Sequence, residues 1–87
     1  MITSRQLGRK AFVEIDVEEY RERRVQMLRR IASKTARRVA SSGREDSLDP
    51  MSAAERRIIH MSLAEHPDVQ TESEGEGNKR RVVIFPR

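Results

Sequence analysis

The sequence predicts a two-layer α+β domain, in which two helices pack on a small mixed sheet of three to four strands in the order βα(β)αββ. Three patterns support this fold. Apolar residues recur at helical spacing through residues 17–42, a second helix begins at a capping motif near Ser52, and two strand-like segments flank a glycine-containing turn near the C-terminus. The 87 residues favour one domain, expected at 11–87 after a flexible N-terminal segment at 1–10.

The first predicted elements are a short strand and a long helix. The alternating apolar residues of AFVEI predict a strand over 11–15. Asp16 with Glu19 three residues later is typical of a helix start, so a helix of roughly 39 Å is expected over 17–42. Its inward stripe is expected to contain Tyr20, Met27, Leu28, Ile31, Thr35 and Val39. Gly43 fits the end of this helix.

The second helix is predicted from its capping signals. A brief extended segment that ends at Leu48 precedes this helix. It is the strand written in parentheses in the order βα(β)αββ. Ser52 and Glu55 form a capping box of the Ser-x-x-Glu type, and Pro67 ends the helix. Its apolar side is expected to contain Ala54, Ile58, Met61 and Leu63, with Ile59 near the boundary.

The C-terminal segments 69–73 and 81–85 are predicted to form a β-hairpin. The acidic, glycine-containing segment 74–78 (EGEGN) supplies the turn. Because residues 82–85 are all apolar, the last strand is expected to be central or covered on both faces.

Composition excludes several classes of function. The chain has no cysteine, which removes disulfides, zinc fingers and thiol nucleophiles, and no apolar run is long enough for a membrane span. His60 and His66 are six residues apart, so they diverge on a helix and do not predict a metal pair. No phosphate-binding loop or serine elbow is present. We therefore expect no enzyme activity, no metal and no cofactor.

The charge pattern favours a polyanionic partner. The net charge is +4, the pI is about 10.3, and fifteen of the eighteen basic residues are Arg. The region 21–44 holds nine Lys or Arg and one Glu. Arg binds phosphate bidentately and stacks on bases, which makes nucleic acid the first candidate. Arg37 and Arg38 are predicted as a secondary basic surface.

Arg56 and His60 are the primary candidate site. Four residues apart on a helix, they share one face, and a forked cation beside an imidazole is suited to phosphate oxygens and base edges. The further candidates for nucleic-acid binding are Arg57, Lys79, Arg80 and Arg81. Two alternatives stay open on spacing alone: a solvated helix face, or a His60 that is a hydrogen-bonded boundary residue.

These residues resemble a known family. The Arg56-x-x-x-His60 pair within ERRIIH is similar to the signature of R-three-H domains. The segments LDPM, AAERRIIH, HPDVQTESEGEG and RRVVIFP resemble the C-terminal R-three-H domain of bacterial Jag proteins, also called SpoIIIJ-associated proteins. FVEIDVEEYRERR at 12–24 resembles the segment that joins a KH domain to it. The resemblance covers about 12–87 and implies that the chain is excised from a longer protein with a preceding KH domain.

The resemblance implies a function without catalysis. It implies binding of single-stranded nucleic acid, RNA for the Jag type, with Arg56, His60 and the adjacent Arg57 on the exposed binding face. It also implies a role with the cell-envelope or sporulation machinery. We expect a cytoplasmic monomer that binds single-stranded RNA or DNA.

Three alternative interpretations remain. The basic face could dock an acidic protein, so that the domain is a protein–protein adaptor. The long first helix could be a coiled-coil or dimerisation arm, or a helix that lies on a membrane surface, although Trp and Phe are missing from its apolar side.

Overall fold

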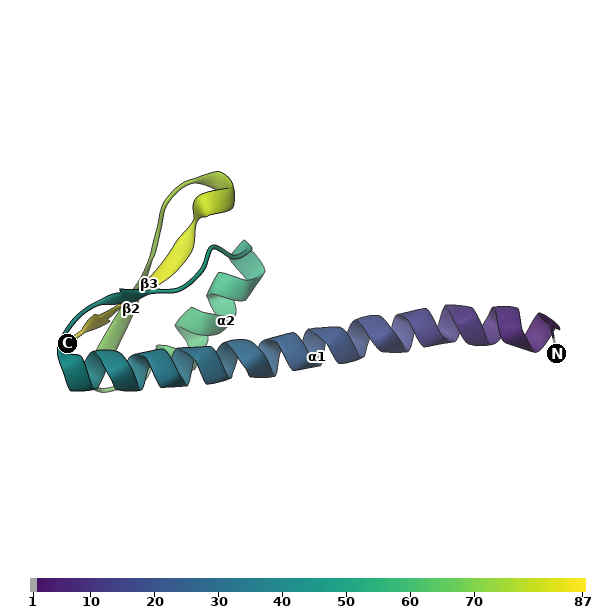
Figure 1. The fold of residues 1–87 in the computed structure, drawn as a ribbon, viewed down its shortest axis with the longest axis horizontal. Helices are drawn as coiled ribbons and strands as arrows, with labels where there is room; N and C mark the ends of the chain where they lie inside the picture. The colour runs from purple at the N-terminus through teal and green to yellow at the C-terminus, as the bar shows by residue number, and fades with distance from the viewer. Residues whose placement is uncertain (1) are drawn as a thin grey trace.

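The computed structural model places two helices beside a three-stranded antiparallel sheet, which confirms the α+β class (Figure 1). The structure describes the backbone of residues 2–87 and the side-chain surroundings of residues 17–87. The elements in chain order are α1 (Ile2–Ser42), β1 (Asp46–Ser47), α2 (Ala53–Leu63), β2 (Val69–Glu74), the 3-10 helix η1 (Gly77–Lys79) and β3 (Arg81–Pro86).

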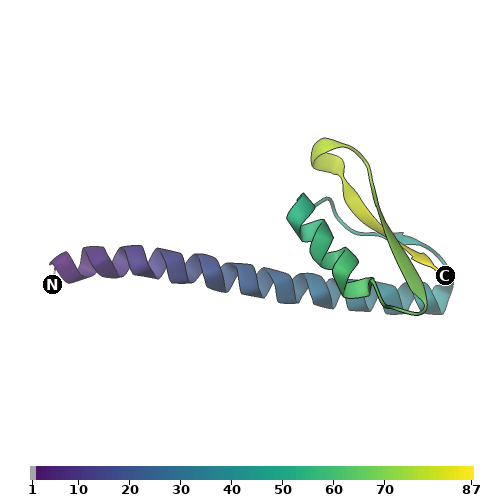
Figure 2. The same cartoon turned by 180° about the vertical axis from the view of Figure 1, so that it is seen from behind.

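Helix α1 is longer than the sequence predicted. It has 41 residues, and the molecule extends 60 Å along its longest axis. The N-terminal half of α1 projects away from the other elements in both views (Figures 1 and 2). The prediction of a strand at 11–15 is wrong, because these residues are part of α1. No proline interrupts residues 2–42, and extending an existing helix is easier than forming a strand without a partner. The flexible segment at 1–10 and the domain boundary at residue 11 stay predictions.

The sheet has the strand order β1-β3-β2, so β3 is central, as its apolar sequence indicated. Both pairings are antiparallel, which corrects the prediction of a mixed sheet. The predicted hairpin is confirmed: β2 pairs with β3 from Val69↔Pro86 to Glu74↔Arg81. Because paired residues share a face, Thr71 and Ser73 lie on the same side of the sheet as Ile84 and Val82.

The core lies between the two helices and one face of the sheet. Its buried residues are Leu28, Ala32, Ala36, Val39, Leu48, Ile59, Leu63, Val69, Val82 and Ile84. On α1 the buried positions follow the predicted stripe from Leu28 to Val39, but Tyr20 and Met27 are exposed. On α2 the predicted apolar side was wrong in part: Ile59 and Leu63 are buried, whereas Ala54 and Met61 face solvent. Ala32 and Ala36 are small, which is compatible with a close approach of α1 to its neighbours.

Glycines with positive φ lie at the end of α1 and at the hairpin turn. Gly43 ends α1 with a φ of 72°, and its N–H donates to the Val39 carbonyl at 2.9 Å. Gly75 begins the hairpin turn with a φ of 95°, and a Cβ there would lie 2.8 Å from the Lys79 carbonyl oxygen. Local sequence therefore fixes where α1 stops and where β2 turns back.

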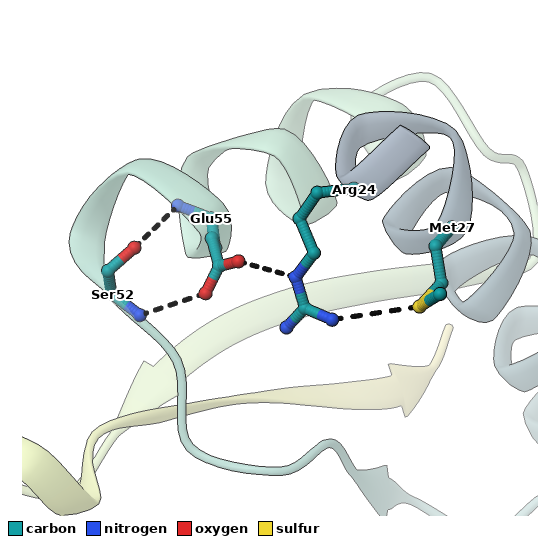
Figure 3. Close-up of polar contacts among 4 residues, drawn as sticks. All are labelled: Arg24, Met27, Ser52 and Glu55. Carbon is teal, nitrogen blue, oxygen red and sulfur yellow. Dashed lines mark hydrogen bonds and ion pairs between the residues drawn. The ribbon is translucent and has the colours of Figure 1, made fainter. Parts of the chain in front are cut away.

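Polar contacts of Glu55 connect the start of α2 to α1 (Figure 3). Ser52 and Glu55 form the predicted capping box, in which the Ser52 hydroxyl accepts from the Glu55 N–H and Glu55 Oε1 accepts from the Ser52 N–H. The other carboxylate oxygen of Glu55 accepts from Arg24 Nε at 2.6 Å. Arg24 Nη1 also lies 3.6 Å from the Met27 sulfur. One carboxylate therefore caps α2 and holds it against α1, and the bond from Arg24 lowers the pKa of Glu55.

We predict that two substitutions of Glu55 separate these two roles. Glu55→Gln keeps a side chain that can complete the capping box but loses the ion pair, so the free energy of unfolding should fall by about 0.5–1 kcal/mol. Glu55→Ala also loses the hydrogen bond that the Glu55 side chain accepts from the Ser52 N–H, and should cost roughly a further 0.5–1 kcal/mol. Urea unfolding measures both. Asp46→Asn, which breaks the more exposed pair with Arg38, is the control. A Glu55→Gln loss no larger than that of Asp46→Asn would contradict the linking role.

Candidate functional site

His60 lies where α2 faces strand β2, and both of its ring nitrogens make hydrogen bonds. Nδ1 is 2.7 Å from the Thr71 hydroxyl oxygen, and Nε2 is 2.8 Å from the Ser73 hydroxyl oxygen. Both hydroxyls lie on the helix-facing side of β2 and are half-buried. The sequence left open whether His60 lies on a solvated helix face or is a hydrogen-bonded boundary residue. The second alternative describes its position in the structure.

Arg56 lies one turn before His60 and is half-buried. Its Nη1 donates to the carbonyl oxygen of Met51 at 2.7 Å, which holds the guanidinium beside the chain that enters α2. Arg56 also lines an open groove of about 470 Å³, shared with the first residues of α2 and with Gly77 and Asn78 of the hairpin turn. The side chain is thus directed toward the hairpin turn.

Arg80 approaches the same place from the hairpin. Its Nη1 donates to the Gly75 carbonyl oxygen at 2.9 Å, so the side chain folds back across the turn. Arg56 faces this same turn through the groove that it shares with Gly77 and Asn78. We call Arg56, His60 and Arg80 the hairpin-side cluster.

Burial is the largest cause of the lowered pKa of His60, followed by Arg56 and then Arg80. Each cause favours the neutral imidazole, which has one nitrogen that donates and one that accepts. The hydroxyl that receives the imidazole hydrogen keeps its own hydrogen for another acceptor, and the second hydroxyl keeps free lone pairs. The cluster can therefore offer hydrogen-bond donors and acceptors beside two fixed positive charges.

The other predicted site residues are distributed around the fold. Arg57 is exposed and lines a different groove, between α1 and α2. Lys79 is exposed in η1. Arg81 is half-buried and lines a groove with Glu45, Asp46 and Glu74.

The secondary basic surface on α1 is partly paired. Arg37 is exposed, whereas Arg38 forms an ion pair with Asp46 at 3.1 Å. The charge that Arg38 offers to a partner is therefore reduced.

Sequence reasoning missed three residues of these sites. Thr71 and Ser73 hold His60, and the signal that could have found them is their alternation with buried Val69 in β2. Arg29 of α1 lines the same groove as Arg57. A sequence pattern gives no direct indication of that pairing, because it depends on how the two helices cross.

Comparison with known proteins identifies the family. The model of the R-three-H domain matches residues 26–86, which includes α2, the hairpin and the C-terminal part of α1. This chain belongs to the R-three-H domain family. The resemblance proposed from the Arg56-x-x-x-His60 signature is therefore confirmed.

Several curated relatives cover most of this R-three-H domain. A protein of Lactiplantibacillus plantarum, named RNA-binding protein KhpB, is 47% identical over 75 residues, which are 86% of this chain and 23% of the relative. Proteins of the same name from Clostridium symbiosum and Bacillus subtilis are 44% and 38% identical, over 83% of this chain and 32% and 36% of their own lengths. The chain thus spans about a quarter to a third of these relatives.

Neither a membrane span nor a metal site is found in the described part of the chain. None of the described helices is both long and apolar enough to cross a membrane. Within the same residues, no group of three or more potential ligands could hold a metal ion.

We predict that His60 makes the stability of the R-three-H domain fall as the pH is lowered. Because its pKa is lower in the folded protein than the usual 6.5, the unfolded chain takes up the proton first as the pH drops. The free energy of unfolding should therefore decrease from about pH 7 toward the folded pKa, by less than about 1.4 kcal/mol per pH unit. Urea unfolding between these pH values measures the slope.

The matched variant is His60→Gln, which removes the titrating group and leaves His66 in place. For this variant, the free energy of unfolding should change less with pH over the same range than it does for the wild type. Equal slopes would show that His60 has the same pKa in the folded and unfolded chains.

Proposed function

We propose that this R-three-H domain binds single-stranded nucleic acid, and RNA in preference to DNA, through the hairpin-side cluster. The observation that carries the proposal is the arrangement of cations beside His60. Backbone carbonyl groups hold Arg56 and Arg80 at the hairpin turn, and among the described residues neither guanidinium forms an ion pair with a carboxylate. A half-buried neutral imidazole between two cations leaves the positive charge available for a polyanion.

Arg56 is proposed to bind a phosphate. Its bond to the Met51 carbonyl fixes the guanidinium, so little side-chain entropy is lost when a ligand binds. A fixed planar fork suits two oxygens of one phosphate. Arg80, held in the same way by the Gly75 carbonyl, is proposed to bind a neighbouring phosphate, and exposed Lys79 adds charge at the same turn.

The preference for RNA is proposed from the hydroxyl pair on β2. The ribose 2′-OH both donates and accepts hydrogen bonds, and the Thr71 and Ser73 hydroxyls can do the same while His60 orients them. The curated relatives are named RNA-binding proteins, which supports the same ligand.

We also propose that the domain is a binding module and not an enzyme, and that it acts in the cytoplasm. Arg57 and Arg81 stay predicted contacts, although the structure directs them toward other grooves. A partner in the cell-envelope or sporulation machinery, and a monomeric state, likewise remain predictions.

We predict that Arg56→Ala weakens binding to a single-stranded oligoribonucleotide and flattens its salt dependence. Loss of one phosphate contact should reduce the slope of log K against log salt by about 0.7. His60→Ala removes no charge at neutral pH, so it should weaken binding with little change of slope. Fluorescence anisotropy at several salt concentrations measures affinity and slope together.

Arg44→Ala is the control, because Arg44 is exposed and lies in the loop after α1. It should change affinity and slope less than Arg56→Ala does. Equal affinities of the wild type and an Arg56→Ala/His60→Ala variant would refute the site. If RNA causes no amide chemical-shift changes while an acidic peptide does, the adaptor interpretation would replace RNA binding.

A further inference from the structure

A second groove lies between α1 and α2, lined by residues of α2 other than Arg56 and His60. It is open to solvent, has a volume of about 580 Å³, and is lined by Arg29, Ala54, Arg57, Ile58, Met61 and Ser62. The two views show α2 beside the C-terminal half of α1 (Figures 1 and 2). This groove and the groove lined by Arg56 have no lining residue in common, although both use α2.

The floor of the groove is apolar and incompletely covered. Met61 is 66% exposed, although its neighbours Ile59 and Leu63 are in the core. Ile58 is half-buried on the same side of α2, and Ala54 is exposed one turn earlier. A flexible thioether on an open apolar surface can adapt to a flat ligand.

The rim of the groove carries two cations. Three other Arg residues of α1 are paired with acids: Arg23 with Glu19, Arg24 with Glu55 and Arg38 with Asp46. Among the described residues, no carboxylate lines this groove or forms an ion pair with Arg29 or Arg57. The groove therefore combines apolar surface with two uncompensated positive charges.

We infer that this groove is a second nucleotide subsite for the same single-stranded RNA, an inference that rests on the proposed function. One base lies on Met61 and Ile58, and the adjoining phosphates are bound by Arg29 and Arg57. Charge complementarity supports a polyanion, and apolar side chains and guanidinium planes can both support the face of a base.

Because both grooves lie on α2, one RNA strand can occupy both of them. Arg57 directly follows Arg56, yet the two side chains line different grooves on different sides of α2. A helix with its side chains is roughly 10–12 Å across, so a strand that reaches both grooves must pass over α2. A short oligonucleotide can occupy one subsite, and a longer one can occupy both.

The length dependence of RNA binding tests the inference. We compare oligouridylates of about 4 and about 12 nucleotides, both within the range of site sizes typical of single-strand binders. Arg29→Ala/Arg57→Ala should lower the salt slope for the longer oligomer by about 1.4, two phosphates at about 0.7 each. The same variant should change the affinity for the shorter oligomer little, because that oligomer binds mainly to the hairpin-side cluster.

The control variant removes the same charge elsewhere. Arg30 and Arg44 are exposed and do not line the groove, so Arg30→Ala/Arg44→Ala should change the slope by less. A control loss as large as that of Arg29→Ala/Arg57→Ala would show that only net charge matters and would overturn the subsite.

Met61→Gln tests the apolar floor, because it keeps the length of an exposed side chain and adds polarity. It should weaken binding of the longer oligouridylate by about threefold but leave an abasic oligomer of the same length unaffected. In the wild type, the ε-methyl resonance of Met61 should shift with the longer RNA. Unchanged affinity together with an unshifted methyl would overturn the inference.

The outcomes distinguish this inference from the function on which it rests. If neither oligouridylate binds the wild type, the proposed function and the subsite both fail. If both bind and only Arg56→Ala or His60→Ala weakens them, the proposed function stands and the second subsite is refuted.

Discussion

The carboxylate of Glu55 is the contact on which the arrangement of both sites depends. One oxygen caps α2 through the Ser52 N–H, and the other receives the hydrogen bond from Arg24 of α1. Together with the buried side chains of Ile59 and Leu63, they set the position and rotation of α2 against α1. Because Arg56, Arg57 and His60 belong to the first two turns or so of α2, this rotation decides which of them face the hairpin. The bond from Arg24 lowers the pKa of Glu55, so the carboxylate keeps its charge to a lower pH than an unpaired Glu would.

Much of the fold could be predicted because its signals are local. The capping box at Ser52, the glycine end at Gly43 and the hairpin around residues 74–78 are each encoded within a few residues, and the structure has them at those places. The strand expected at 11–15 failed because five alternating residues are weak evidence when a long helix follows without a break. The outward position of Met61 could not be predicted, since it depends on how α1 and α2 cross.

The site was predictable only in part, for the same reason. The spacing of Arg56 and His60 is a property of any helix, and in the structure both lie on the side of α2 that faces the hairpin. Their partners belong to β2 and to the hairpin turn, distant in sequence, so the hydroxyls of Thr71 and Ser73 were not found. Consecutive residues of a helix point about 100° apart, so grouping Arg57 with Arg56 required knowledge of what lies on each side of α2.

The hydrogen bonds of His60 bear on what this R-three-H domain can recognise. An imidazolium at this position would add charge between Arg56 and Arg80 but could only donate, whereas the neutral ring lets one hydroxyl of β2 donate outward and the other accept. In the proposed complex, the guanidinium groups supply the long-range attraction, and the contacts that would distinguish one sugar from another are short-range and uncharged. Because salt screens the long-range attraction far more than the short-range contacts, the proposed discrimination between RNA and DNA should persist at ionic strengths that weaken binding to both.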